Sequence, residues 1–97
     1  MKAITRFRKL SATQATLLTI AMMCLRDWNE IVVDDSEVYV TFTEDGHCTV
    51  TASLVMRWGA PIISLCEQIQ KHITEEIEVM TPFTVDAVHV AVKRLDM

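Results

Sequence analysis

The sequence predicts a two-layer α+β sandwich in which two helices cover one face of a three-stranded sheet, in the order α-β-β-α-β. Two segments carry apolar residues at helical spacing, two neighbouring runs alternate around an Asp-Gly turn, and a third alternating run follows the second helix. The 97 residues, 51% of them hydrophobic, suffice for one well-cored domain and are too few for two. We therefore expect a basic N-terminal arm at residues 1–10 and a single α+β domain at residues 11–97.

A capping box marks the start of the first predicted helix. Ser11 and Gln14 stand three residues apart, so the Ser11 hydroxyl would accept from the Gln14 amide while the Gln14 side chain reaches back. The helix should therefore begin near Ala12. Its apolar residues recur at i, i+3, i+4, i+7 and i+10 and are Leu18, Ala21, Met22, Leu25 and Trp28.

An Asp-Gly turn at Asp45-Gly46 joins two alternating runs and predicts a β-hairpin. One face of the hairpin should be buried, because every second side chain is apolar: Val38, Val40, Phe42, Cys48, Val50, Ala52, Leu54, Met56 and Trp58. The opposite face carries mostly short polar side chains, namely Tyr39, Thr41, Thr43, Thr49, Thr51, Ser53 and Val55. A weakly charged face of this kind either tolerates water or meets another protein.

A second helix and a third strand complete the pattern. Pro61 suits the first turn of a helix, where its missing N–H would have had no partner. The apolar stripe of this helix is Ile62, Leu65, Cys66, Ile69, Ile73, Ile77 and Met80. Pro82 ends it, and Val88, Val90 and Val92 then alternate as a strand. This strand fits two places, antiparallel beside the first strand or parallel beside the second.

The formal charge of −4 is divided unevenly along the chain. Residues 1–26 hold five Lys and Arg and no acid, whereas residues 27–97 hold four bases and all thirteen acids, a net −9. An acidic body is a poor general nucleic-acid binder, so no nucleic acid is expected as a partner. The arm, with Lys2, Arg6, Arg8 and Lys9, is a candidate contact for an anionic lipid surface or an acidic partner.

The alternative function from another class is a small nucleic-acid-binding module of the KH kind, which would use the basic arm. The α-β-β-α-β order overlaps such folds, but they clamp the backbone with a G-x-x-G loop. Gly46 and Gly59 are the only glycines and stand 13 positions apart, so the sequence has no such loop.

No catalytic, cofactor or metal chemistry is indicated, and we expect no enzyme. The cysteines Cys24, Cys48 and Cys66 form no C-x-x-C pair and are odd in number, which favours free thiols in a reducing cytosol. The longest apolar stretch, residues 15–25, is about half the length that spans a bilayer. Trp28, Trp58, Met22, Met56 and Met80 are predicted core residues, with Trp58, beside Arg57, the first candidate for a partner contact if it is exposed.

The second half of the chain resembles the alkaline shock, or general stress, family of small bacterial envelope-stress proteins, as a divergent member. The resemblance covers residues 37–93 and begins with the hairpin turn Glu44-Asp45-Gly46 and the long strand ending at Trp58-Gly59. It continues through the helix segment Glu67-Gln68-Ile69-Gln70-Lys71-His72-Ile73 into Glu78-Val79-Met80-Thr81, and closes with Val85-x-x-Val88-x-Val90-x-Val92.

The resemblance implies a non-catalytic cytoplasmic protein of cell-envelope homeostasis that acts through protein–protein interaction. Members of the family are similar in being held at the membrane by a small anchor protein and in self-assembling. We therefore expect a homo-oligomer with a protein partner, near the membrane, whose contact with lipid is indirect or made by the arm. The predicted partner-binding residues are Lys2, Arg6, Arg8, Lys9, Tyr39, Thr41, Thr49, Thr51, Arg57 and Trp58.

Overall fold

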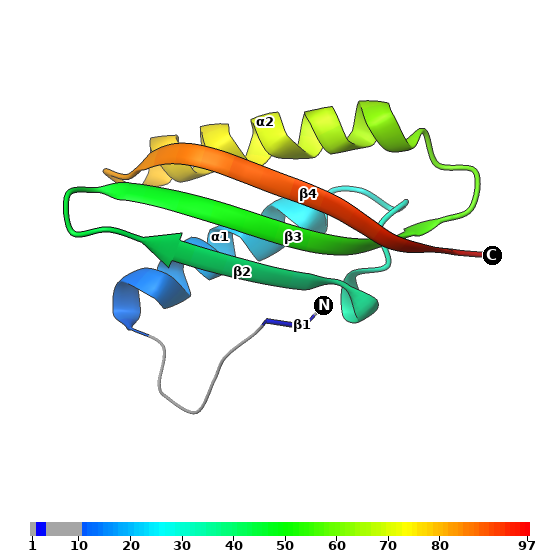
Figure 1. Cartoon of the computed structure of the whole chain (residues 1–97), viewed down its shortest axis with the longest axis horizontal. Coiled ribbons are helices and arrows are strands. Elements are labelled where there is room, and N and C mark those ends of the chain that lie inside the picture. Colours follow the sequence, from blue (N-terminus) through cyan, green and yellow to red (C-terminus); the bar gives the residue numbers. More distant parts are fainter. Residues whose placement is uncertain (1, 4–10) are drawn as a thin grey trace.

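The computed structural model describes residues 2–3 and 11–97 and confirms the predicted α+β class (Figure 1). Its helices are α1 (Ala12–Leu25), α2 (Ile62–Met80) and the short 3-10 helix η1 (Val33–Asp35). Its strands are β1 (Lys2–Ala3), β2 (Glu37–Phe42), β3 (His47–Arg57) and β4 (Thr84–Asp96). The order α1-β2-β3-α2-β4 is the predicted one, and β1 adds two residues of strand at an edge of the sheet.

The sheet has the order β1-β2-β3-β4 and is mixed. The hairpin β2–β3 is antiparallel, whereas β4 runs parallel to β3, so the last strand takes the second of its two possible places. At the other edge β1 pairs with β2 in parallel, Lys2 opposite Glu37 and Ala3 opposite Val38. Of the arm residues predicted to bind a partner, Lys2 thus belongs to β1, while Arg6, Arg8 and Lys9 lie outside the described residues.

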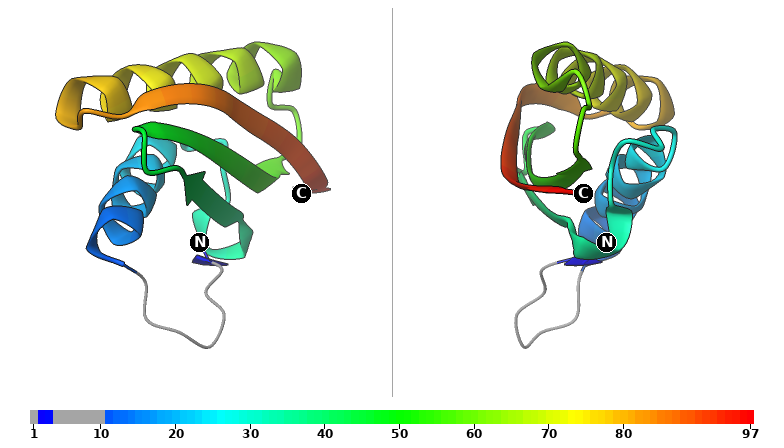
Figure 2. Two further views of the ribbon diagram at one scale, coloured as in Figure 1. Left: turned by 60° about the vertical axis from the view of Figure 1, so that its left-hand side comes forward. Right: turned by 90° about the vertical axis from the view of Figure 1, so that its right-hand side faces the viewer.

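Both long helices lie on one face of the sheet, as predicted. Figure 2 shows them side by side behind the strands, with α1 nearer β2 and α2 nearer β4. Ser11 caps α1 as predicted, because the Gln14 N–H donates to the Ser11 hydroxyl at 3.0 Å. The Gln14 side chain, predicted to reach back to Ser11, donates instead to the Val40 carbonyl at 3.2 Å. The hairpin turns at Gly46, whose φ of 90° is a left-handed conformation that glycine adopts without steric cost.

The core lies between the helices and the inner face of the hairpin. Helix α1 is buried around more of its circumference than its predicted stripe, since Leu17, Ile20 and Cys24 are buried together with Leu18, Ala21 and Leu25. The reason is that α1 packs against both the sheet and α2. Helix α2 contributes the single stripe Leu65, Ile69, Ile73 and Ile77. Burial of each such Leu or Ile stabilises the fold by about 1.5–3 kcal/mol.

Four sequence predictions of burial were wrong. Met80, Trp58 and Phe42 are 59%, 67% and 37% exposed. Each stands at or just beyond the end of its helix or strand, where the opposing layer no longer covers it. Val55, predicted on the polar face, is fully buried. It lies at a register shift between β3 and β4, where its N–H donates to the buried Ser36 hydroxyl at 3.0 Å.

Candidate functional site

The face of the sheet opposite the helices brings four predicted partner-binding residues together. Tyr39 lies opposite Thr51 and Thr41 opposite Thr49 in the β2–β3 register. On the other side of β3, Thr51 lies opposite His89 on β4. We call the following set the sheet face: Tyr39, Thr41, Thr49, Thr51, Ala87, His89 and Ala91. No element within residues 2–3 and 11–97 covers it (Figures 1 and 2).

The sheet face results directly from strand alternation. Val38, Val40, Val50 and Ala52 point into the core and are buried, so their neighbours point outward. Most of these outward side chains are short, so little side-chain entropy is lost when the surface is covered. The threonine hydroxyls both donate and accept hydrogen bonds. The sheet face is therefore suited to contact with another protein without the cost of burying charge.

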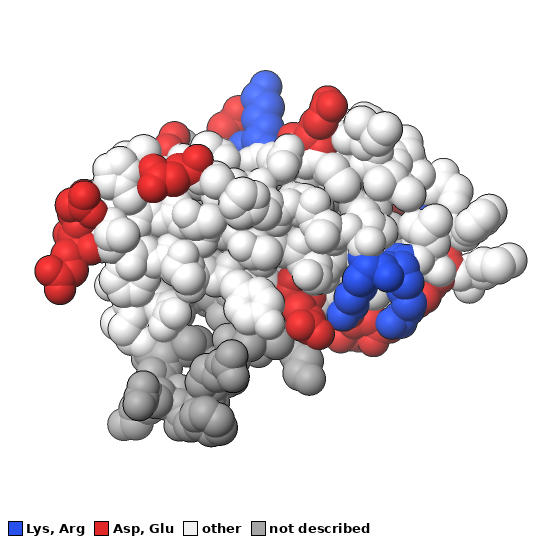
Figure 3. Space-filling model, viewed as in Figure 1, with Lys and Arg blue, Asp and Glu red and all other residues white. Residues whose placement is uncertain are grey.

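Charged side chains gather around the sheet face and leave its middle uncharged (Figure 3). At one margin the Lys93 ammonium lies 3.3 Å from the Glu37 carboxylate. Arg94 contacts two carboxylates, Asp35 at 3.0 Å and Asp96 at 2.8 Å, and the hydrogen bond from Arg94 lowers the pKa of Asp96. Two cations thus face three carboxylates, so these pairs offset most of the charge at this margin and leave a net −1.

The opposite margin holds a histidine–carboxylate pair at the tip of the hairpin. His47 Nδ1 lies 2.7 Å from the Asp86 carboxylate, which joins the start of β3 to the start of β4. The hydrogen bond and charge of Asp86 raise the pKa of His47. This margin therefore becomes more positive as the pH falls.

β4 is an edge strand, because the sheet order ends with it. Successive backbone groups of a strand alternate between its two edges, so about half of those in β4 face away from β3. Two of its backbone groups bond to α2, where the Gln70 side chain donates to the Val88 carbonyl at 2.9 Å and the Val85 N–H donates to Glu78 at 2.9 Å. The thirteen-residue strand is otherwise without a neighbouring strand at this edge among the described residues.

Arg57 is the last residue of β3, and Trp58 follows it. Their side chains differ in how firmly they are held. The Arg57 guanidinium donates from Nε to the Asn29 carbonyl at 2.8 Å, which fixes the side chain against the segment after α1. Trp58 is held by its backbone, whose N–H donates to the Asp96 carbonyl at 2.6 Å, while its indole is 67% exposed. Large aromatic side chains are enriched among interface hot spots, so Trp58 is the residue of this pair that is better suited to partner contact.

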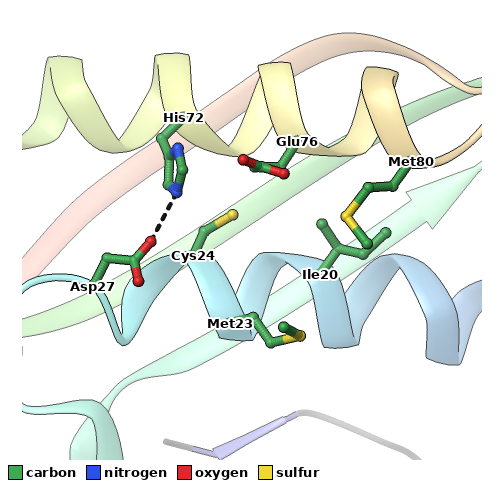
Figure 4. Close-up of a pocket in the computed structure, with 7 residues that line it drawn as sticks. All are labelled: Ile20, Met23, Cys24, Asp27, His72, Glu76 and Met80. Atoms are coloured by element: carbon green, nitrogen blue, oxygen red, sulfur yellow. Dashed lines mark hydrogen bonds and ion pairs between the residues drawn. The ribbon is translucent and has the colours of Figure 1, made fainter.

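A second feature, absent from the sequence predictions, is a pocket between α1 and α2 (Figure 4). Its lining residues are Ile20, Met23, Cys24, Asp27, His72, Glu76 and Met80, and its volume is about 190 Å³. The Asp27 carboxylate lies 2.9 Å from His72 Nε2, and this contact joins the end of α1 to α2. The Trp28 ring meets the His72 ring edge-on, with centroids 5.4 Å apart.

The surroundings of the cysteine in this pocket disfavour its thiolate form. Burial, together with the nearby carboxylates of Glu76 and Asp27, raises the pKa of Cys24 to about 11. Burial likewise raises the pKa of Cys48 and of Cys66. Within the described residues no group of three or more His, Cys, Asp or Glu side chains is placed to hold a metal ion.

A second helical stripe is the sequence signal that would have found this pocket. Thr16, Ile20, Met23 and Asp27 recur at i, i+4, i+7 and i+11, which places them on one side of α1. The residues of this second stripe alternate along the chain with those of the stripe that packs on the sheet. The second stripe is therefore hard to recognise in the sequence. Whether this side of α1 contacts α2 depends on the relative position of the two helices. The spacing of residues within one helix does not reveal that position.

A comparison with protein-family models settles the relationship of this chain to known proteins. The alkaline shock protein 23 family, described by its cell envelope-related function, matches residues 32–97. The chain belongs to this family. The match contains β2, β3, α2 and β4, and so contains all of the sheet face and the α2 side of the pocket.

Membership of the alkaline shock protein family confirms the resemblance drawn from the residues of the second half of the chain. A cell envelope-related function follows from it. Neither the curated proteins nor the solved structures gave a match to the chain. In the part of the chain that the structure describes, neither α1 nor α2 is long and apolar enough to cross a bilayer.

Proposed function

We propose that this alkaline shock family protein is non-catalytic and serves the cell envelope by binding other proteins, its own copies among them, through the sheet face. The observation that carries the proposal is an exposed sheet surface whose middle is uncharged. Covering Tyr39, Thr51 and His89 buries polar groups that form hydrogen bonds readily and breaks no ion pair.

Self-association has a physical route at the edge of the same sheet. The outward backbone groups of β4 beyond Val88, which bond to no residue of α2, are able to pair with a strand of another copy, and such pairing supplies a row of hydrogen bonds. Contact through the sheet face is the other route, since two sheets pack face to face at about 10 Å. Both routes use surfaces that lie side by side, so one copy is able to meet more than one neighbour.

The location and the partner that we propose rest on the family resemblance. The protein would work in the cytoplasm beside the membrane, held there by a small membrane-anchor protein. Trp58, exposed at the end of β3, is the contact that we assign to this partner. Contact with lipid would then be indirect or made by the arm.

Sedimentation equilibrium of the purified chain and two variants tests the self-association. Thr51→Arg inserts a long cation between Tyr39 and His89 in the middle of the sheet face. Gln68→Arg adds the same charge on the exposed side of α2 and is the matched control. We expect the wild type and Gln68→Arg to gain mass with concentration and Thr51→Arg to gain clearly less, because it loses the contacts made through the sheet face. A wild type that is monomeric throughout, or two variants that behave alike, would contradict the proposal.

A further inference from the structure

The pocket of Figure 4 is one end of a longer groove along the helix layer. A second hollow is lined by Thr16, Ile20 and Met23 together with Met80, and a third by Thr16, Leu17, Met80 and Phe83. Met80 lines all three hollows, and Ile20 and Met23 line two of them. The hollows therefore adjoin one another and follow α1 from its start to its last turn, on the side of the molecule away from the sheet face.

The groove has an apolar floor and methionine walls. Ile20 and Cys24 are 5% and 2% exposed and form its floor, whereas Met23 and Met80 stand at 57% and 59% exposure. Exposed methionines are costly to leave in water and adapt their shape to apolar partners, as on promiscuous helix-binding surfaces. The remaining lining is mainly small or uncharged, with Thr16, Thr19 and Pro82 among it.

The charged side chains that line the groove are all acidic and lie at one end of it. Among its lining residues only Asp27 and Glu76 are charged, both are acids, and both lie at the end formed by the last turn of α1 and the middle of α2. His72 contacts Asp27, and no Lys or Arg among the described residues pairs with Glu76. A ligand that fills the groove would therefore carry apolar groups along its length and a cation at one end.

We propose that this groove binds a basic amphipathic helix of a partner protein, a second binding site distinct from the sheet face. α1 has 14 residues, which at 1.5 Å each span about 21 Å, so the groove accommodates about three to four turns of helix. The apolar stripe of the bound helix lies between Met23 and Met80, and a Lys or Arg at one end meets Glu76 and Asp27. Such helix-in-groove binding uses anchors at i, i+3 or i+4, and i+7.

A synthetic amphipathic peptide that stands in for the partner helix tests the proposal. The probe is a fluorescein-labelled peptide of about 15 residues built from Leu and Lys, with all Leu on one helical face. Its counterpart has Glu in place of every Lys. Fluorescence anisotropy with the full chain should show tighter binding of the Lys peptide, by at least about tenfold, because the acids of the groove attract one and repel the other.

Two double variants separate the groove from general charge attraction. Met23→Lys with Met80→Lys places cations in the groove, whereas Ile63→Lys with Val79→Lys makes the same change at exposed α2 positions outside it. We expect the first to weaken binding of the Lys peptide at least about tenfold more than the second. Equal weakening by both, or none by either, would overturn the proposal.

Glu76→Gln supplies an isosteric variant that keeps the test valid if the methionine variants fold poorly. It should weaken binding of the Lys peptide and reduce the dependence of that binding on salt. Unchanged affinity and salt dependence would overturn the assigned role of Glu76.

Sedimentation of the Met23→Lys/Met80→Lys variant distinguishes a partner helix from a second copy. We expect the same mass as the wild type, and a fall in mass would show that the groove is filled by another copy, which overturns the proposal. The Thr51→Arg variant should bind the Lys peptide as the wild type does. Failure of the sheet-face proposal would therefore leave this result unaffected, and failure of the groove proposal would leave the sheet face untouched.

Discussion

Asp27 and His72, 45 positions apart in sequence, meet at 2.9 Å between a carboxylate oxygen and Nε2 and connect the end of α1 to the middle of α2. Trp28 packs edge-on against the same imidazole. This contact links the two helices at one end of the groove. The Asp27 side chain is 63% exposed and that of His72 is 31% exposed, so the link remains in contact with water.

Replacement of His72 by Ala should lower the free energy of unfolding by about 1–2 kcal/mol. The change removes one hydrogen bond, worth about 0.5–1.5 kcal/mol, and the edge contact with Trp28, worth a similar amount. Urea denaturation measures this change in the free energy of unfolding. Lys71→Ala is the control, because Lys71 forms only an exposed pair with Glu75 at 3.9 Å and should change stability by less than about 0.5 kcal/mol. Equal losses would mean that the helix link does not stabilise the fold.

The His47–Asp86 pair should make stability depend on pH. Asp86 raises the pKa of His47 in the folded state above the unfolded value of about 6.5. The stability that the His47–Asp86 pair contributes is therefore complete below about pH 6.5, and it is lost as the pH rises through the pKa of His47 in the folded state. We expect the stability advantage of the wild type over His47→Gln to be complete below about pH 6.5 and to shrink as the pH rises above it, with urea midpoints as the measurement.

Asp86→Asn is the matched variant for that experiment. It keeps the size of the side chain and removes the negative charge, so the His47 resonances in an NMR titration should move to a lower pKa. An unaltered His47 titration in Asp86→Asn would refute the assigned cause.

The three thiols should differ in reactivity according to their exposure. Cys24 is 2% exposed with a pKa raised to about 11, and Cys48 is also 2% exposed, whereas Cys66 is half-buried. Thiolate is the reactive form, so iodoacetamide at about pH 8 should modify Cys66 first and Cys24 only after unfolding. Mass spectrometry of digested samples gives the order. Early modification of Cys24 in the folded protein would contradict the described packing.

The two long helices and the three long strands were predictable from local signals, whereas β1 and η1 were not. The N-cap at Ser11, the Asp45-Gly46 turn and the alternation of the hairpin act within a few residues, so sequence alone locates them. The place of β4 could not be derived in this way, because Val88, Val90 and Val92 would bury the same face at either edge of the hairpin. The structure places β4 beside β3, and α2 packs against it there.

The candidate surfaces were predictable to different degrees. Tyr39, Thr41, Thr49 and Thr51 share a face by alternation alone, and the structure brings them together. The exposure of Trp58 was not predictable, since the alternation that buries the strand interior ends with the strand. The pocket depends on contact between side chains of α1 and α2. Spacing within one element carries no information about such a contact.

Photo-cross-linking from the sheet face tests the central claim most directly. A photoreactive amino acid at position 51 reports on the middle of the face, and the same group at position 68 reports on the exposed side of α2. On illumination of the purified full-length protein, we predict covalent dimers linked from position 51 and monomers from position 68. Monomers from position 51, or equal dimer yields from both positions, would contradict self-association through the sheet face.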